Sequence, residues 1–222
     1  MEKVIIALIG CLPLCSSVAS QERPRELRGV GHVLGETAEQ FFSVGSVGEL
    51  VHACEKKDWK TVKYLAKTVE QQSKVKAKEF CDKVAVIKQG ATAGERQEFR
   101  GSGDIETMRT DSFTLDRGHL VKIRMIYAMP IVVLEGFRPK SFAELFAGLR
   151  EAYGDPSKSY SEPVVSTYGV KRDAHRAIWE GKQNVISVTE HLGEHGQIEI
   201  VAETLAEYER DAQAPKTANP LQ

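Results

Sequence analysis

The most suggestive pair for metal chemistry is His191 and His195, which stand four positions apart with Glu194 between them. On a helix this spacing would place both imidazoles on one face, where they could bind zinc. Gly193 and Gly196 interrupt the segment and favour a turn between two strands. We therefore predict a polar turn at these histidines and no metal site.

The four cysteines divide into two pairs by position. Cys11 and Cys15 lie in the apolar N-terminal stretch, whereas Cys54 and Cys81 lie 27 residues apart in the body of the chain. Redox motifs keep their two cysteines close together, and a zinc site needs two further ligands with local spacing. Cys54 and Cys81 are therefore predicted to form a structural disulfide, which requires an oxidising compartment.

Motifs for nucleotide or acyl chemistry do not occur in the sequence. It has no phosphate loop and no G-x-S-x-G turn, and Gly29, Gly31 and Gly35 lack the spacing of a dinucleotide-binding loop. Glu190 and Glu203 alternate with apolar residues and are expected to face water. We predict no catalytic residue and no cofactor. The alternative is an acid–base pair that only folding brings together.

The net charge of the chain argues against some classes of binding partner. Lys+Arg is 30 and Asp+Glu is 31, so the net charge of −1 provides no basic field for nucleic acid or an anionic membrane. A cationic stripe on one predicted strand consists of Arg117, His119, Lys122 and Arg124. It could bind an anionic ligand, but a solvated sheet face is the simpler interpretation. Trp59 and Trp179 are expected in the core.

Residues 1–20 have the organisation of a secretory signal peptide. A start containing Lys3 precedes the apolar run 4–14, and cleavage is predicted after Ser20. The run is shorter than the roughly 20 apolar residues that cross a bilayer, so we predict no transmembrane span in the mature chain. Residues 8–11 also resemble a bacterial lipobox, which makes a lipid anchor on Cys11 the alternative. The other alternative is a buried N-terminal strand or helix.

Residues 27–90 are predicted to be rich in helices. Leu27–Leu34 could form an edge strand, and Thr37 can cap a short helix after it. Ser46 and Glu49 match a capping box, which would start the next helix.

A longer helical region follows Asp58, which can cap it. Apolar residues then recur at helical spacing in one helix or two, as far as about Lys88. In this arrangement the disulfide ties a short helix at Cys54 to the last helix at Cys81.

Residues 104–210 are predicted to form an antiparallel sheet with one amphipathic helix on a face. A glycine-rich loop at 90–103, with a short strand at 97–100, separates this part from the helices. A tight turn at 116–118 joins two strands that end near residue 128. Further strands are predicted at 164–170, 175–180, 184–192 and 197–203.

The helix over 142–153 is the most sharply bounded element. Ser141 and Glu144 match a capping box at its start, and Gly154 and Pro156 stop it. A helical turn is expected at 205–210, and residues 211–222 are predicted to be a disordered tail. The fold class is therefore α+β.

Three segments resemble small uncharacterised exported bacterial proteins with an α+β fold. They are LFAGLREAYGDP, in which the helix ends in Tyr-Gly, the tryptophan-containing strand AIWEGKQNVISV, and the opening segment GHVLGETAEQFF. The resemblance covers about half of the 222 residues. It implies an exported α+β domain and assigns no site residue or activity.

These observations favour an exported protein, periplasmic or secreted, that binds a partner without catalysis. The partner would be an unknown protein or an envelope component. The alternative is a small extracytoplasmic hydrolase. A cleft lined by two carboxylates, or by a histidine and a carboxylate, would favour the hydrolase. An apolar patch or groove without convergent polar groups would favour the binding protein.

Overall fold

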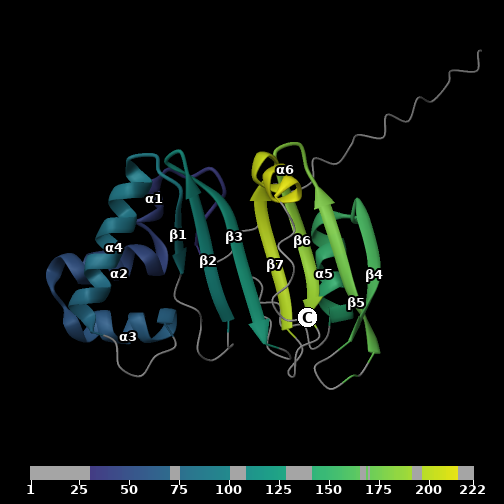
Figure 1. Ribbon diagram of the computed structural model, residues 1–222, viewed down its shortest axis with the longest axis horizontal. Coiled ribbons are helices and arrows are strands. Elements are labelled where there is room, and N and C mark those ends of the chain that lie inside the picture. The colour runs from purple at the N-terminus through teal and green to yellow at the C-terminus, as the bar shows by residue number, and fades with distance from the viewer. Residues whose placement is uncertain are drawn as a thin grey trace, which may run out of the picture.

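The computed structural model describes residues 31–70, 76–100, 109–128, 142–165, 169, 171–191 and 197–214. Four helices come first, followed by three strands, one helix, four further strands and a last helix. The strands form an antiparallel sheet (Figure 1). The predicted α+β class is confirmed. The predicted signal peptide and the lipobox cysteine Cys11 lie outside the described residues.

The four leading helices are α1 (Ala38–Phe41), α2 (Gly45–Lys56), α3 (Trp59–Glu70) and α4 (Ala77–Thr92). Thr37 caps α1, because its hydroxyl accepts the N–H of Gln40 and the Gln40 side chain accepts the N–H of Thr37. Asp58 accepts the N–H of Thr61 at the start of α3. Both predicted caps are confirmed.

The predicted capping box at Ser46 and Glu49 is wrong. Helix α2 begins at Gly45, and its N-cap residue Val44, two positions before Ser46, makes no side-chain cap. The reason is the tight turn from α1 into α2, where a Cβ on Gly48 would lie 2.5 Å from the carbonyl carbon of Ser43. This close packing sets the start of the helix and overrides the local capping signal.

The strands are β1 (Gln97–Arg100), β2 (Arg109–Asp116), β3 (His119–Ala128), β4 (Lys158–Val165), β5 (Lys171–Glu180), β6 (Asn184–His191) and β7 (Gln197–Thr204). Their order in the sheet is β1-β2-β3-β7-β6-β5-β4, and every neighbouring pair is antiparallel. Strand β7 therefore joins two three-stranded meanders. It pairs with β3 on one side and with β6 on the other.

One face of the sheet forms the core across β2, β3, β7, β6 and β5. A single cross-strand row on this face consists of Phe113, Ile123, Ala202, Ile186 and Trp179. All five side chains are buried. Because directly opposed residues point to the same side of a sheet, this row fixes the face on which the helices must pack.

Helices cover both ends of that face. Phe41 of α1 contacts Phe113 at one end, with 5.1 Å between ring centroids. At the other end Phe146 of α5 (Phe142–Tyr153) lies 6.0 Å from the ring of Trp179. The Trp179 indole N–H donates to the carbonyl of Gly154, where α5 ends as predicted. Figure 1 shows α1, α2 and α4 beside β1, and α5 near β4 and β5.

The β2–β3 hairpin turns at Arg117 and Gly118, whose φ angles are both positive (51° and 78°). This is the backbone of a two-residue turn that matches the twist of antiparallel strands. The pairing register then shifts between Thr114 and Leu115. As a result Val121, which was predicted to face the core, is only half-buried, whereas Ile123 and its successors at alternate positions are buried as predicted.

Helix α6 (Leu205–Gln213) closes the end of the sheet beside β6 and β7. Thr204 caps it by accepting the N–H of Glu207. The buried Glu207 carboxylate accepts two hydrogen bonds from Arg96, at 2.7 and 3.2 Å, and also pairs with Arg210. The helix extends beyond residue 210, so the predicted tail begins three residues too early, and its part at 215–222 lies outside the described residues.

Other boundaries also differ from prediction. Helix α4 continues to Thr92 because Gly90 packs against β1, where a Cβ would lie 2.5 Å from Nε2 of Gln97. Strand β4 begins at residue 158, not 164, because pairing with β5 orders a polar sequence. Residues 31–34, the described part of the predicted edge strand, form no strand. Within the described residues, no helix has the length and apolarity needed to cross a membrane.

Candidate binding groove beside the disulfide

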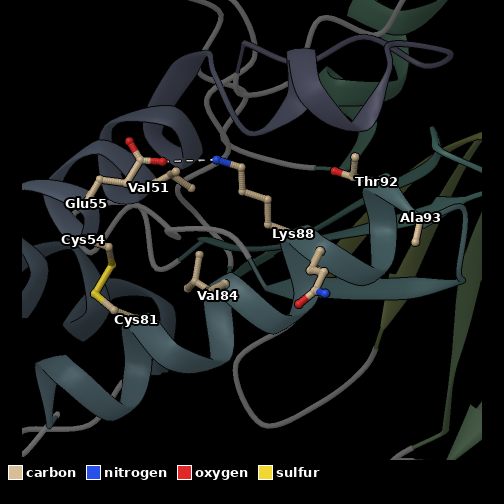
Figure 2. Close-up of a pocket in the computed structure, with 10 residues that line it drawn as sticks. Val51, Cys54, Glu55, Cys81, Val84, Lys88, Thr92 and Ala93 are labelled. Atoms are coloured by element: carbon tan, nitrogen blue, oxygen red, sulfur yellow. Dashed lines mark hydrogen bonds and ion pairs between the residues drawn. A yellow bond between two sulfur atoms is a disulfide. The ribbon is translucent and has the colours of Figure 1, made fainter.

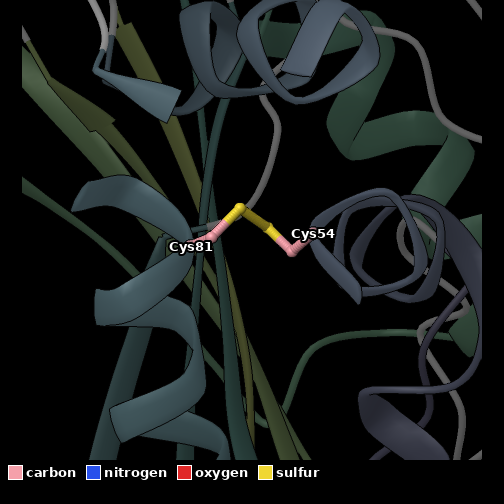
Figure 3. The surroundings of a disulfide bond; sticks show 2 residues. All are labelled: Cys54 and Cys81. Carbon is pink, nitrogen blue, oxygen red and sulfur yellow. A yellow bond between two sulfur atoms is a disulfide. The ribbon is translucent and has the colours of Figure 1, made fainter. Parts of the chain in front are cut away.

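Cys54 and Cys81 form the predicted disulfide. The S–S distance is 2.01 Å and the Cα atoms lie 5.5 Å apart. The bond joins the C-terminal part of α2 to the first turns of α4 (Figure 3). Helix α3 is the intervening segment of the chain and packs against both of its neighbours. The disulfide thus holds α2 and α4 side by side, although α3 separates them in the sequence.

A groove of about 550 Å³ lies between α2 and α4, next to the disulfide. Its lining follows one face of α4 for about three turns. Figure 2 shows this face with the disulfide at one end and Thr92 and Ala93 at the other. The lining residues are Val51, Cys54, Glu55, Cys81, Val84, Ala85, Lys88, Gln89, Thr92 and Ala93. This volume falls within the usual range of roughly 300–1,000 Å³ for ligand sites.

One ion pair spans the groove. The Lys88 ammonium lies 3.2 Å from a Glu55 carboxylate oxygen, and the two side chains are 40% and 61% exposed (Figure 2). Because each charge has its partner, the groove offers no uncompensated charge to a ligand. Apart from this exposed pair, its walls are aliphatic carbon, the disulfide sulfurs and small polar groups. No group in the lining is placed for acid–base or nucleophilic chemistry.

A serine and a histidine meet elsewhere, on the exposed end of the core face. Ser161 Oγ of β4 lies 2.7 Å from Nδ1 of His175 on β5. The His175 ring stacks on Phe142 of α5 at 5.6 Å. Glu190 of β6 is a neighbour, but its carboxylate accepts the backbone N–H of His175 at 3.4 Å and not a ring N–H. Among the described residues, no third group orients the His175 ring as a catalytic triad requires, so the contact is a serine–histidine pair alone.

His32 is a third candidate for chemistry, and it is closed to solvent. Its Nδ1 lies 2.7 Å from Oε1 of Glu36, and its ring contacts Phe41 and Phe113. Nε2 has no hydrogen-bond partner among the described residues. Burial lowers the pKa of His32, although Glu36 opposes the shift. With a relative exposure of 0%, this imidazole cannot reach a ligand from solvent.

The residues singled out in the sequence are not brought together. His191 ends β6, and His195 lies outside the described residues. No cluster that could hold a metal occurs among the described side chains. Two members of the cationic stripe are compensated, because Lys122 pairs with Glu203 and Asp211, and Arg124 pairs with Glu199.

Two expectations about burial are wrong. Glu203 is buried (5% exposed), because α6 returns over its strand, and burial raises its pKa against the opposing effect of Lys122. Trp59 is 39% exposed because it starts α3, where Val62 and Leu65 occupy the buried face. The other tryptophan, Trp179, is in the core as predicted.

Sequence reasoning missed the groove, although one signal for it exists. Cys81, Ala85, Lys88 and Thr92 recur at spacings of four, three and four residues, which places them along one face of a helix. Such a stripe with small residues and a half-cystine leaves room between two helices.

A scan of protein-family models gave no match to this chain, and searches of curated proteins and of solved structures gave none either.

Proposed function

We propose that this chain is an exported binding protein, periplasmic or secreted, whose groove between α2 and α4 receives a short helical segment of a partner protein. The single observation that carries the proposal is a preformed groove with apolar walls beside the disulfide. The disulfide and the signal-like N-terminus support export, because such bonds persist in oxidising compartments.

The shape and charge of the groove favour one kind of occupant. It runs beside one face of α4 for about three turns, which suits the apolar face of an amphipathic helix. The Lys88–Glu55 pair compensates its own charge, so the segment in contact with it should be uncharged. The expected partner therefore presents a short apolar stripe with small side chains opposite α4.

Two arginine substitutions on neighbouring residues of α4 test the site. Ala85→Arg places a long charged side chain in the groove, whereas Val86→Arg is a control at a position that is 66% exposed and outside the lining. In pull-downs from the native envelope or culture medium, read by mass spectrometry, the partner should be retained by Val86→Arg and lost with Ala85→Arg. Equal recovery by both folded variants contradicts the proposal.

Export has a separate test. The mass of the protein isolated from its cells should correspond to a start after Ser20, with Cys54 and Cys81 oxidised. A lipid-sized addition on Cys11 would support the anchored alternative. A species that starts at Met1 with both later thiols free would contradict export altogether.

The Ser161–His175 hydrogen bond supports a second candidate function, a small hydrolase. In that case the purified protein should hydrolyse p-nitrophenyl acetate above background, and both Ser161→Ala and His175→Gln should lose this activity. Hydrolysis that persists in both variants would show that the pair is not a catalytic site.

A further inference from the structure

The outer edge of β4 is the longer of the two free edges in the described sheet. Strand β4 has eight residues, whereas β1 at the opposite edge has four. Every side chain from Lys158 to Pro163 is exposed, and no described strand lies beyond them. An edge of this length presents unpaired backbone groups that can add another strand.

The direction of the backbone groups on β4 follows from its neighbour. The N–H of His175 on β5 points to Glu190 on β6. Its partner Ser161 therefore forms a non-hydrogen-bonded pair with it and directs its own N–H and C=O outward. Ser159 shares this orientation by alternation. Pro163 does too, which agrees with the placement of prolines on edge strands with the nitrogen facing away from the sheet.

The side chains along this edge are self-complementary. Lys158, Tyr160 and Glu162 alternate along β4 and therefore lie on one face, with one positive and one negative charge at equal distances from Tyr160. We propose that β4 pairs antiparallel with β4 of a second copy of this chain, about a two-fold axis at Tyr160. Lys158 then faces the partner's Glu162, and the same pair recurs on the other side of the axis.

The backbone agrees with this register. Ser159 lies opposite the partner's Ser161, and both direct their backbone groups outward, so the two symmetry-related pairs can exchange hydrogen bonds. The ladder ends at Pro163, which has no N–H to donate. Centring the axis on Glu162 would oppose two like charges, and centring it on Ser161 would form no ion pair. Charge complementarity therefore selects the axis at Tyr160.

Charge reversal tests the pairing by sedimentation over a wide concentration range. Glu162→Lys is the cleaner single variant, because Lys158 also pairs with Glu180 within its own chain, at 2.6 Å. It should weaken the dimer about tenfold, since two attractive pairs become repulsive. The double variant Lys158→Glu/Glu162→Lys should restore it. A wild-type chain that is monomeric at every concentration, or a double variant no stronger than the single one, overturns the proposal.

Cysteine trapping provides a second readout. Tyr160→Cys places two thiols on the axis at a non-hydrogen-bonded position, where the Cα atoms lie roughly 4.5 Å apart and a disulfide can form. Val165→Cys is the control, because this residue is 63% exposed but lies beyond the paired segment. Oxidation should link the first variant into dimers and leave the second largely monomeric. Equal cross-linking of both contradicts the pairing. The groove variant Ala85→Arg should dimerise normally, so this proposal and the groove proposal fail separately.

Discussion

His32 is a buried imidazole whose protonation is coupled to folding. It is fully buried between two phenylalanine rings, and burial lowers its pKa below the ordinary value of 6.5. The unfolded chain therefore binds a proton at pH values where the folded chain does not. The stability that this residue contributes is present above about pH 6.5 and is lost as the pH falls through the interval down to the lowered pKa.

This linkage predicts a measurable slope. The contribution of His32 to the free energy of unfolding, read from urea titrations, should fall by up to about 1.4 kcal/mol per pH unit as the pH drops below about 6.5. His32→Gln can still donate a hydrogen bond to Glu36. Its slope should be smaller than that of wild type by up to about 1.4 kcal/mol per pH unit, which corresponds to one proton. His119→Gln, an exposed site, is the matched control and should keep the wild-type slope. The account is wrong if His32→Gln and wild type have the same pH dependence.

Glu203 illustrates what alternation along a strand can and cannot predict. The sequence correctly placed it on the face opposite Ile200 and Ala202. It did not show that α6 would fold back over that face, since this depends on ion pairs across the sheet end. Side-chain direction along a strand is local information, whereas burial depends on what packs there later.

The disulfide between α2 and α4 should contribute strongly to stability. Closing a loop of 27 residues in the unfolded chain is worth about 3–4 kcal/mol in the chain-entropy model. The double variant Cys54→Ala/Cys81→Ala should lose this amount in urea unfolding. A reductant should destabilise wild type to a similar extent and leave the double variant unchanged. If reduction changes neither protein, the bond does not contribute as described.

Helix α6 should depend on its buried carboxylate. Glu207→Ala removes the partner of Arg96 and Arg210 and should lower the free energy of unfolding by about 1–3 kcal/mol. Glu209→Ala on the same helix is exposed and should change it by less than about 0.5 kcal/mol. Equal effects from the two substitutions would show that the ion pairs do not hold the helix.

Prediction from the sequence succeeded for elements whose ends are marked by local residues. Helix α5 has an apolar stripe and stops at Gly154, and the β2–β3 hairpin has its turn residues in place. Strand β4 was missed from Lys158 to Pro163 because this segment is largely polar and becomes a strand only by pairing with β5. The groove was missed for a related reason, since a space between two helices depends on their packing and not on either helix alone.

The two helix-covered ends of the sheet should unfold together. The buried row from Phe113 to Trp179 crosses five strands without a break, so neither end has a separate core. The chain has two tryptophans, one in α3 and one in β5, which makes a direct test possible. Trp59→Phe and Trp179→Phe each leave one fluorescent reporter.

In each variant, tryptophan fluorescence and far-ultraviolet circular dichroism should give the same urea midpoint. Comparing the two probes within one variant removes any effect of the substitution itself on stability. An α3 reporter that changes at lower urea than the circular dichroism signal would show that the helical end melts independently.

The position of β7 has a consequence for the order in which the protein can be completed. This strand is the last of the described strands in chain order, yet it lies in the middle of the sheet between β3 and β6. Until residues 197–204 leave the ribosome, β3 and β6 each present an unpaired strand edge. A chain that stalls before residue 197 would expose two aggregation-prone strand edges at once, so the synthesis of β7 is the step that closes both of them.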